Sequence, residues 1–474
     1  MRLASLLAVS ATLALGPVPA WAGIAGVGAA NGSARGLASN PATAVGSGGY
    51  ELSFDLTGTL ALLHYTRAPY EGTDPSSDPD RTFATSDTLQ HGLAPSFAFR
   101  MDPLRPAAGQ RAGPRRARSP LGVGLSLSFP SGTNIDLQPN GPGRYHMVNA
   151  SALTGYLAPV VAWRVHPRLR IGAGPALSIS RLSFKKRIDL APSLQELTGG
   201  DPRYTPESGL LEGQIEVNDA QGYGATWTAG ALFEAGDRAL LGIGFIAPSR
   251  TTMRGTSMVT PSLDFDVHSK GRFALSQNLP PILNAGARYR LRETLMLTAE
   301  AQWVGWSRAR TSHLTITGST LYSESGETQL LLDTLGINEG QLVENILDKD
   351  QPAPRGYRDG WNVVVGTELG SGSLRWRAET GFFRATVPNE YVNPSNLDFD
   401  NVLLGGGAIW NPSAVKGLQV GLNVFEYVNG GRKIRNSRYQ TYDAPHGVLY
   451  ALPTGNGTYR LLVTRAVLTT DWRF

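Results

Sequence analysis

The chain has 474 residues, of which 41% are hydrophobic, and it carries a formal net charge of +5 and no cysteine. The lack of cysteine excludes disulfide bonds, thiolate metal sites and thiol nucleophiles, and the hydrophobic fraction is too low for a helical membrane protein. Much of the basic excess lies in 105–120, which has five arginines but none of the interleaved aromatic residues of a nucleic-acid-binding face, so we expect no nucleic-acid partner.

The first residues predict a secretory signal peptide at 1–22. Arg2 supplies the positive start, Leu3 to Leu15 form the apolar stretch, and Ala20-Trp21-Ala22 is an A-x-A cleavage site. No later run approaches about 18 apolar residues, so the sequence predicts no transmembrane helix. We therefore expect an exported protein that is either soluble or a β-barrel.

The segment 23–48 comes next and is rich in small residues. Near its centre, Asn40-Pro41-Ala42 predicts a rigid turn, because Pro41 fixes φ and the Asn40 side chain can satisfy backbone groups. Before a soluble domain this stretch would be a linker. Before a barrel whose lumen is too wide for wall side chains to fill, it can occupy the lumen. We interpret 23–48 as a hatch, anchored to the wall by Asn40, Pro41 and Ala42.

Alternation of apolar and polar residues recurs throughout 49–474 and predicts strands with two different faces. Near the C-terminus, Trp472, Leu468 and Leu462 fall on one face, while Asp471 and Arg465 fall on the other. The fold class is therefore all-β: a transmembrane antiparallel barrel of about fourteen strands, with both of its ends on one side. The strands are predicted at 49–65, 88–101, 119–131, 149–166, 168–186, 219–235, 237–250, 271–290, 293–317, 356–370, 373–387, 398–411, 414–429 and 457–474.

Three features favour a membrane barrel over a soluble β-sandwich. The predicted strands are long, about 10 to 18 residues against a usual 5 to 6 in globular sheets. Short connections such as 166–168 alternate with long ones such as 318–354, as in outer-membrane barrels. Aromatic residues gather near the strand ends, as in interfacial girdles: Tyr50, Tyr65, Trp163, Trp227, Tyr289, Trp303, Trp306, Trp361, Trp410, Tyr427 and Trp472.

The sequence shows no catalytic or metal-binding pattern. Its seven histidines are isolated, with no H-E-x-x-H motif and no close pair. There is no G-x-S-x-G nucleophile motif, and the glycines of 26–32 do not follow a strand as a nucleotide-binding loop would. We expect no enzymatic activity, no cofactor and no bound metal.

One long loop, 327–350, has apolar residues at helical spacing. Two interpretations remain open. The helices cap the rim of the barrel, or their apolar faces capture a hydrophobic ligand. The residues concerned are Leu330, Leu331, Leu335, Leu342, Val343, Ile346 and Leu347.

An ordered series of segments carries a family resemblance. "SNPATAV" stands before the first strand, and "FPSG", "GRYHM", "LAPVVAWRVHPRLRIGAGPALSIS", "NLPPILNAGARYRLRETLMLTAEAQWVGWSR", "YRDGWNVVVGTELG" and "VPNEY" follow. In this order the chain resembles the FadL-type outer-membrane transporters, which include long-chain fatty-acid channels and relatives for aromatic hydrocarbons. The resemblance implies a 14-stranded barrel, an N-terminal hatch in its lumen, and passive uptake of hydrophobic molecules.

The resemblance also implies a path: capture at extracellular loops, a lumen pocket, and sideways exit through a gap where the third strand is kinked. In that strand, Gly122 and Gly124 lack side chains and Pro130 donates no ladder bond, so each can mark the opening. Arg375 and Arg377 face the lumen and are candidates for contacting a ligand carboxylate. Glu379 lies on the same face, and the alternative is that it pairs with them.

Three functions remain open from the sequence. We prefer passive uptake of hydrophobic compounds, long-chain fatty acids before aromatic hydrocarbons. The alternatives are a structural or adhesion barrel without transport, and a general porin. We expect a monomer in the outer membrane of a Gram-negative-type cell, surrounded by membrane lipid. We also expect the barrel assembly machinery to recognise the terminal Phe474 of the chain during biogenesis.

Overall fold

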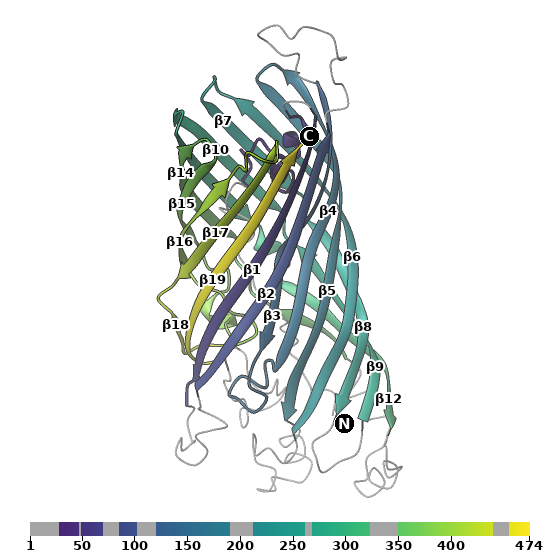
Figure 1. Cartoon of the computed structure of the whole chain (residues 1–474). Coiled ribbons are helices and arrows are strands. Elements are labelled where there is room, and N and C mark those ends of the chain that lie inside the picture. Colours follow the sequence, from purple (N-terminus) through teal and green to yellow (C-terminus); the bar gives the residue numbers. More distant parts are fainter. Residues whose placement is uncertain are drawn as a thin grey trace, which may run out of the picture.

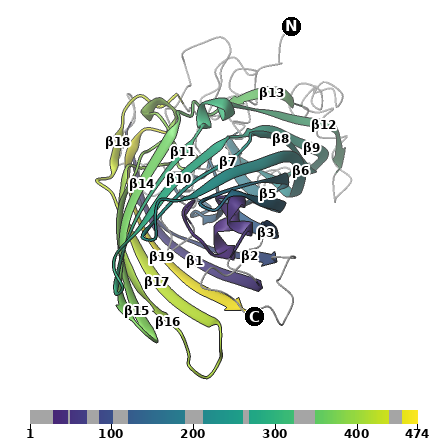
Figure 2. The same ribbon diagram turned by 90° about the horizontal axis from the view of Figure 1, so that it is seen from above.

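The computed structural model describes residues 28–46, 49–69, 85–101, 120–189, 212–260, 268–322, 349–438 and 455–474. Antiparallel strands form one closed sheet, because β1 (Tyr50–Arg67) pairs with both β2 (Thr85–Met101) and β19 (Gly457–Arg473). Closure gives the tilted barrel of Figures 1 and 2. No described helix is both long and apolar enough to cross a membrane.

The sheet has nineteen strands. Some consecutive strands continue one another at the same position around the wall, so the barrel has fourteen strand positions, which confirms the predicted number. Five of the fourteen positions are each made of two consecutive strands. The breaks fall at 247–248, 280–281, 305–310, 355–359 and 429–431. Pro248, Pro280 and Pro281 lie in two of these breaks, where a residue without an N–H cannot continue a ladder.

The other elements follow in chain order: η1 (Ala34–Ala38), η2 (Pro41–Ala44), β3 (Leu121–Asp136), β4 (Asn149–His166), β5 (Leu169–Asp189), β6 (Glu212–Glu234), β7 (Ala239–Ile246), β8 (Ser249–Thr260), β9 (His268–Leu279), β10 (Ile282–Arg292), β11 (Leu295–Val304), η3 (Trp306–Ala309), β12 (Thr311–Tyr322), β13 (Lys349–Pro354), β14 (Gly360–Ser371), β15 (Leu374–Phe383), η5 (Asn389–Tyr391), β16 (Asn401–Trp410), β17 (Leu418–Val428) and β18 (Arg432–Ile434).

The two ends of the barrel differ, as the connection lengths predict. At one end β1 begins and β19 ends, where Tyr50 and Phe474 exchange two backbone hydrogen bonds of 3.0 and 3.1 Å. Tight connections such as 167–168 and 372–373 lie at this short-turn end. The opposite end, called the long-loop end below, carries the long connections (Figure 1).

Apolar side chains face outward along the wall, while the inward faces of the strands carry both polar and apolar side chains. On β19, Trp472, Leu468 and Leu462 are exposed, while Asp471 and Arg465 are buried, which confirms the predicted faces. Exposed aromatic residues include Trp163, Trp227, Trp361, Trp410 and Trp472. The girdle prediction is wrong for Tyr65 and Tyr427, which point inward and are 2% exposed.

Leu468 tests which face meets hydrocarbon, since it lies outward between Trp472 and Arg460 on β19. Replacing Leu468 with Arg should lower the free energy of unfolding by about 2–4 kcal/mol, the cost of a cation near the bilayer midplane. Denaturant titration of the protein in lipid vesicles measures this, with Leu468→Ala as the control. A Leu468→Arg variant no less stable than the Ala variant would contradict a lipid-facing position.

Candidate functional site

Residues 28–46, called the plug below, lie inside the barrel near the short-turn end (Figure 2). They contain η1 and η2 and contact strands β1 to β6. Most of these residues are fully buried, although their side chains are small or polar. The plug forms part of the predicted hatch; 23–27, 47–48 and the signal peptide 1–22 lie outside the described residues.

Asn40 links three parts of the structure. Its Oδ1 accepts from the Ala42 backbone N–H at 3.0 Å, which caps η2 with Pro41 in the first turn. Its Nδ2 donates to the carbonyl oxygen of Ala29 within the plug at 2.8 Å and to that of Ala231 on β6 at 2.9 Å. The wall residue facing this part of the plug is Gly172. It has room for no side chain, because a Cβ there would overlap the Pro41–Ala42 backbone.

Arg35 joins the plug to the seam between the first and last strands. Its Nε lies 2.9 Å from Asp55 of β1, and its Nη2 lies 3.2 Å from Asp471 of β19. All three side chains are at most 8% exposed. Such a group is stable only while its charges stay compensated, since an unpaired buried charge is costly.

Wall arginines donate to the plug in return. Arg100 donates to the carbonyl oxygens of Gly32 and Thr43, both at 2.8 Å, and Arg170 donates to that of Val45 at 2.9 Å. The wall also compensates their charge, through Glu51 for Arg100 and Glu234 for Arg170. These contacts add to the apolar packing of Leu37 and Val45 against the wall.

A small polar cavity remains between the plug and strands β10, β11, β14 and β15. It has a volume of about 30 Å³ and is lined by Gly28, Asn31, Arg288, Thr298, Glu300, Val364, Thr367, Glu368, Arg377 and Glu379. One or two water molecules fit in such a space, but a hydrocarbon does not. The cavity is therefore no path past the plug for a hydrophobic compound.

Arg375 and Arg377, the candidate carboxylate contacts, both form ion pairs with Glu368 of β14. The Arg377 Nε donates to Glu368 at 3.0 Å. The sequence offered Glu379 of the same strand as their alternative partner, whereas Glu368 lies on the neighbouring strand. Both arginines therefore already have a carboxylate partner.

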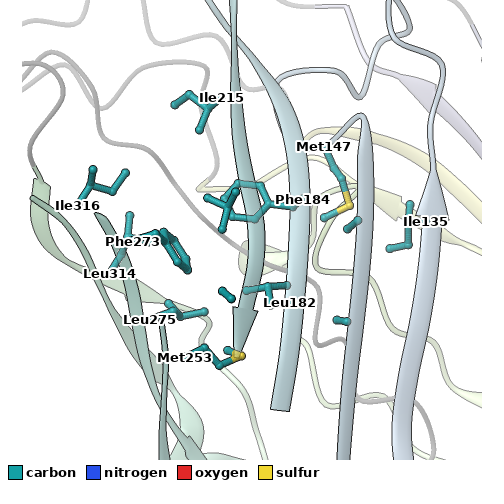
Figure 3. Close-up of a cluster of buried hydrophobic side chains, with 14 of the residues drawn as sticks. Ile135, Met147, Leu182, Phe184, Ile215, Met253, Phe273, Leu275, Leu314 and Ile316 are labelled. Carbon is teal, nitrogen blue, oxygen red and sulfur yellow. The ribbon is translucent and has the colours of Figure 1, made fainter. Parts of the chain in front are cut away.

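A cluster of apolar side chains lies inside the barrel toward the long-loop end (Figure 3). Inward-facing side chains from strands on both sides of the lumen meet there, and Phe184 and Phe273 pack edge to face at 6.0 Å. The apolar cluster consists of Leu63, Ile135, Leu137, Met147, Ala150, Ala152, Leu182, Phe184, Ile188, Ile215, Val217, Ala220, Met253, Phe273, Leu275, Leu314 and Ile316.

Two loops pack over the apolar cluster. Loop 137–148 contributes Leu137 and Met147, and its Arg144 donates to Glu212 of β6 at 2.9 Å. Loop 384–400 adds Leu397 and is fastened by Asp398, which accepts from the Thr386 backbone N–H at 2.6 Å. Burial raises the pKa of Asp398 to about 6. Both loops are ordered by hydrogen bonds as well as by apolar packing.

Arg465 of β19 is a buried cation without a carboxylate partner among the described residues. It is 5% exposed, and its Nη1 donates to the Tyr427 hydroxyl at 3.1 Å, while its Nε has no hydrogen-bond partner there. Its neighbours include the buried side chains of Phe425 and Val467. The alternation indicated that Arg465 faces inward, but not that it lacks a partner.

The wall has an irregular region at β3. No described pair joins 92–96 of β2 to 128–133 of β3, and the pairing resumes with a shift of one residue. On the other side, Ser128 pairs with Tyr156 and Ser131 with Thr154, so β3 contains one extra residue, a bulge at 129–130. The backbone of β3 is thus displaced at the same level relative to both neighbours.

The residues predicted to mark the opening fall in two places. Pro130 lies in the bulge. Gly122 and Gly124 lie in the regularly paired part of β3, beneath the plug: a Cβ on Gly122 would meet Ala44, and one on Gly124 would meet Leu37. The predicted capture residues, Leu330 to Leu347, and all five arginines of the basic segment 105–120 lie outside the described residues.

Comparisons with known proteins agree on one architecture. The sequence model of the family described as "Outer membrane protein transport protein (OMPP1/FadL/TodX)" matches residues 112–447. No curated protein sequence matches significantly. The crystal structure of a Pseudomonas aeruginosa FadL homologue aligns with a TM-score of 0.72 at 15% identity, covering 97% of this chain and 98% of that one.

Two toluene transporters have the same fold. The Ralstonia pickettii transporter TbuX aligns with a TM-score of 0.59 at 15% identity, over 97% of this chain and 98% of its own. The Pseudomonas putida transporter TodX aligns with a TM-score of 0.61 at 13% identity, over 93% and 94%. At such low identity the similarity concerns the fold alone.

Arg35→Gln tests how the plug is held. The change leaves Asp55 and Asp471 buried without their cation, and breaking such a pair costs about 3–5 kcal/mol. We expect the plug to detach in a measurable fraction of molecules, seen as ion conductance in planar lipid bilayers above that of the unchanged protein. The control is Arg473→Gln, whose side chain is 59% exposed. If both variants conduct equally, Arg35 does not hold the plug.

Proposed function

Because the chain belongs to the family of outer membrane protein transport proteins that includes FadL and TodX, we propose that it imports long-chain fatty acids. The protein is an outer-membrane β-barrel that transports hydrophobic compounds. In such barrels the short turns face the periplasm and the long loops face outward. The apolar cluster therefore lies on the extracellular side and the plug on the periplasmic side.

The apolar cluster supports binding of an acyl chain. It is built from flexible side chains such as Met147 and Met253 together with Leu, Ile and Phe, and methionine adapts its shape to a ligand. The aromatic pair Phe184 and Phe273 would also suit an aromatic hydrocarbon. The cluster alone therefore supports a hydrophobic ligand without deciding between the two classes.

Arg465 is the observation that favours a fatty acid. A buried guanidinium without a carboxylate is costly by itself, and the carboxylate of a ligand would compensate it through charge-assisted hydrogen bonds. Leu461 and Leu63, which pair across β19 and β1, both adjoin the apolar cluster. Leu461 is four residues from Arg465, roughly 13 Å along the strand. One ligand with its carboxylate at Arg465 can therefore place its chain in the cluster.

The bulge of β3 supports a sideways exit. The unpaired stretch between β2 and β3 borders the apolar cluster, since Ile135 and Ala150 pair across β3 and β4 just beyond it. The other direction leads to the plug, which is held by buried ion pairs and arginine-to-carbonyl hydrogen bonds as well as by small apolar side chains. An apolar ligand would lose its favourable surroundings there but keep them on passing into the bilayer. In this proposal the plug of 28–46 is the hatch, fastened by Asn40, Pro41 and Ala42, and it gates the lumen.

Arg465→Met should weaken fatty-acid binding by roughly tenfold to a hundredfold, because a hydrogen bond to a charged group contributes about 1.5–3 kcal/mol. Competition against a fluorescent fatty acid, with the purified protein in detergent, measures the change. Arg375→Met is the matched control, since Arg375 already pairs with Glu368.

The ligand classes separate in the same assay. A fatty alcohol of equal chain length should bind the Arg465→Met variant as tightly as it binds the unchanged protein. The same should hold for toluene. If Arg465→Met leaves fatty-acid binding intact while toluene competes well, the aromatic hydrocarbon becomes the better proposal.

Deleting Pro130 tests the exit. The extra residue of β3 would be gone, so that both ladders can pair without a shift and the inward faces on either side are kept. We expect the variant to fold, as shown by the heat-dependent gel mobility of barrels, but to lose fatty-acid uptake in cells. Pro130→Ala keeps the extra residue and should keep most uptake. Normal uptake by the deletion variant would contradict the lateral route.

A further inference from the structure

The outward surface of the barrel changes from apolar to basic toward the extracellular end of β5. Ile171, Leu177 and Ile179 face outward along the strand, and the next outward residue is Arg181, whose side chain is 62% exposed. On the adjacent β6, Tyr223 is 62% exposed at this level. Aromatic residues of this kind mark the border between hydrocarbon and headgroups. Arg181 therefore stands at the extracellular border of the apolar band.

Further cations continue from Arg181 across the neighbouring strands. Arg181 pairs with Gln221 of β6, and Gln221 pairs with Arg254 of β8. Two strand spacings separate the two arginines, about 10 Å. Arg254 pairs with Ala274 of β9, so Arg272 is its diagonal neighbour on the same face, and such neighbours lie about 7–8 Å apart. Lys270 follows Arg272 on that face.

These four residues, Arg181, Arg254, Lys270 and Arg272, form a basic patch with little internal compensation. Arg181 pairs with Asp219 at 2.5 Å. The nearby Glu216 pairs with Lys185 at 2.9 Å. The other three cations of the patch are exposed and form no ion pair with a carboxylate of the described residues.

From this arrangement we propose that the basic patch binds the phosphorylated headgroup of a glycolipid in the outer leaflet, with its acyl chains along the apolar surface of β5 and β6. The charges suit phosphate, which guanidinium groups bind with two parallel hydrogen bonds. The position suits a lipid, because Leu177, Ile179 and Tyr223 continue the surface directly below the cations. A free anion would use the cations but not the apolar surface beneath them.

The test compares lipid A, dephosphorylated lipid A and inorganic phosphate as ligands of the purified barrel in detergent, by native mass spectrometry and titration. We expect lipid A to bind the unchanged protein at least about tenfold more tightly than its dephosphorylated form, as charge-assisted contacts of this kind imply. The double variant Arg254→Gln/Arg272→Gln should lose this preference and still bind fatty acid.

The matched control is Arg290→Gln/Arg292→Gln, which removes two exposed arginines at the periplasmic end of β10. It should bind lipid A like the unchanged protein. Equal binding of the two lipid A forms to the unchanged protein, which needs no variant to fold, would overturn the proposal. Equal losses in both double variants would overturn the location, and competition by phosphate alone at the concentration of lipid A would indicate an ion site instead.

Discussion

The structure depends on one constraint: in a bilayer, every backbone N–H and C=O must find its partner within the protein. Closure of β1 against β19 meets this demand along the whole seam. A closed barrel of fourteen strands then encloses more space than the side chains of its wall fill. The plug occupies one half of this space, and apolar side chains converge in the other. Closure therefore creates the interior space that the plug and the apolar cluster occupy.

The plug is held by compensated charge. A plug of small residues contributes little apolar area, so buried ion pairs and arginine-to-carbonyl hydrogen bonds fasten it, as with Arg35 and Arg100. Such contacts bind only in a matched geometry, since separating the partners leaves charges without water. They suit the gating role that we propose for the plug. Arg465 differs, because the described chain supplies no carboxylate for it.

The sequence predicts the wall well and the interior poorly. Alternation is a local property, so residues such as Leu468 and Asp471 reveal their faces directly. Many interior contacts join residues far apart in the chain, and no local pattern predicts that Arg35 meets Asp55 and Asp471. Glu368 and Arg377 differ, because they lie opposite each other in the hairpin of β14 and β15, so that their pairing depends on the register of one turn. Gly122 was informative for a different reason than expected, since it marks close approach of the plug. Among the predicted residues, Asn40 has the fullest local signal, because its cap bond to Ala42 spans two positions.

The bulge of β3 carried a local signal in the sequence. Before it, even-numbered residues such as Ser126 and Ser128 face inward, while beyond it the odd-numbered Ile135 does so. One extra residue reverses the alternation, and without that reversal Ile135 would face lipid while Asn134 faced the apolar cluster. The sequence changes its phase at the place where the ladder is interrupted. The interruption of the ladder and the lining of the apolar cluster are thus encoded together in the alternation of β3, beside which we propose the lateral exit.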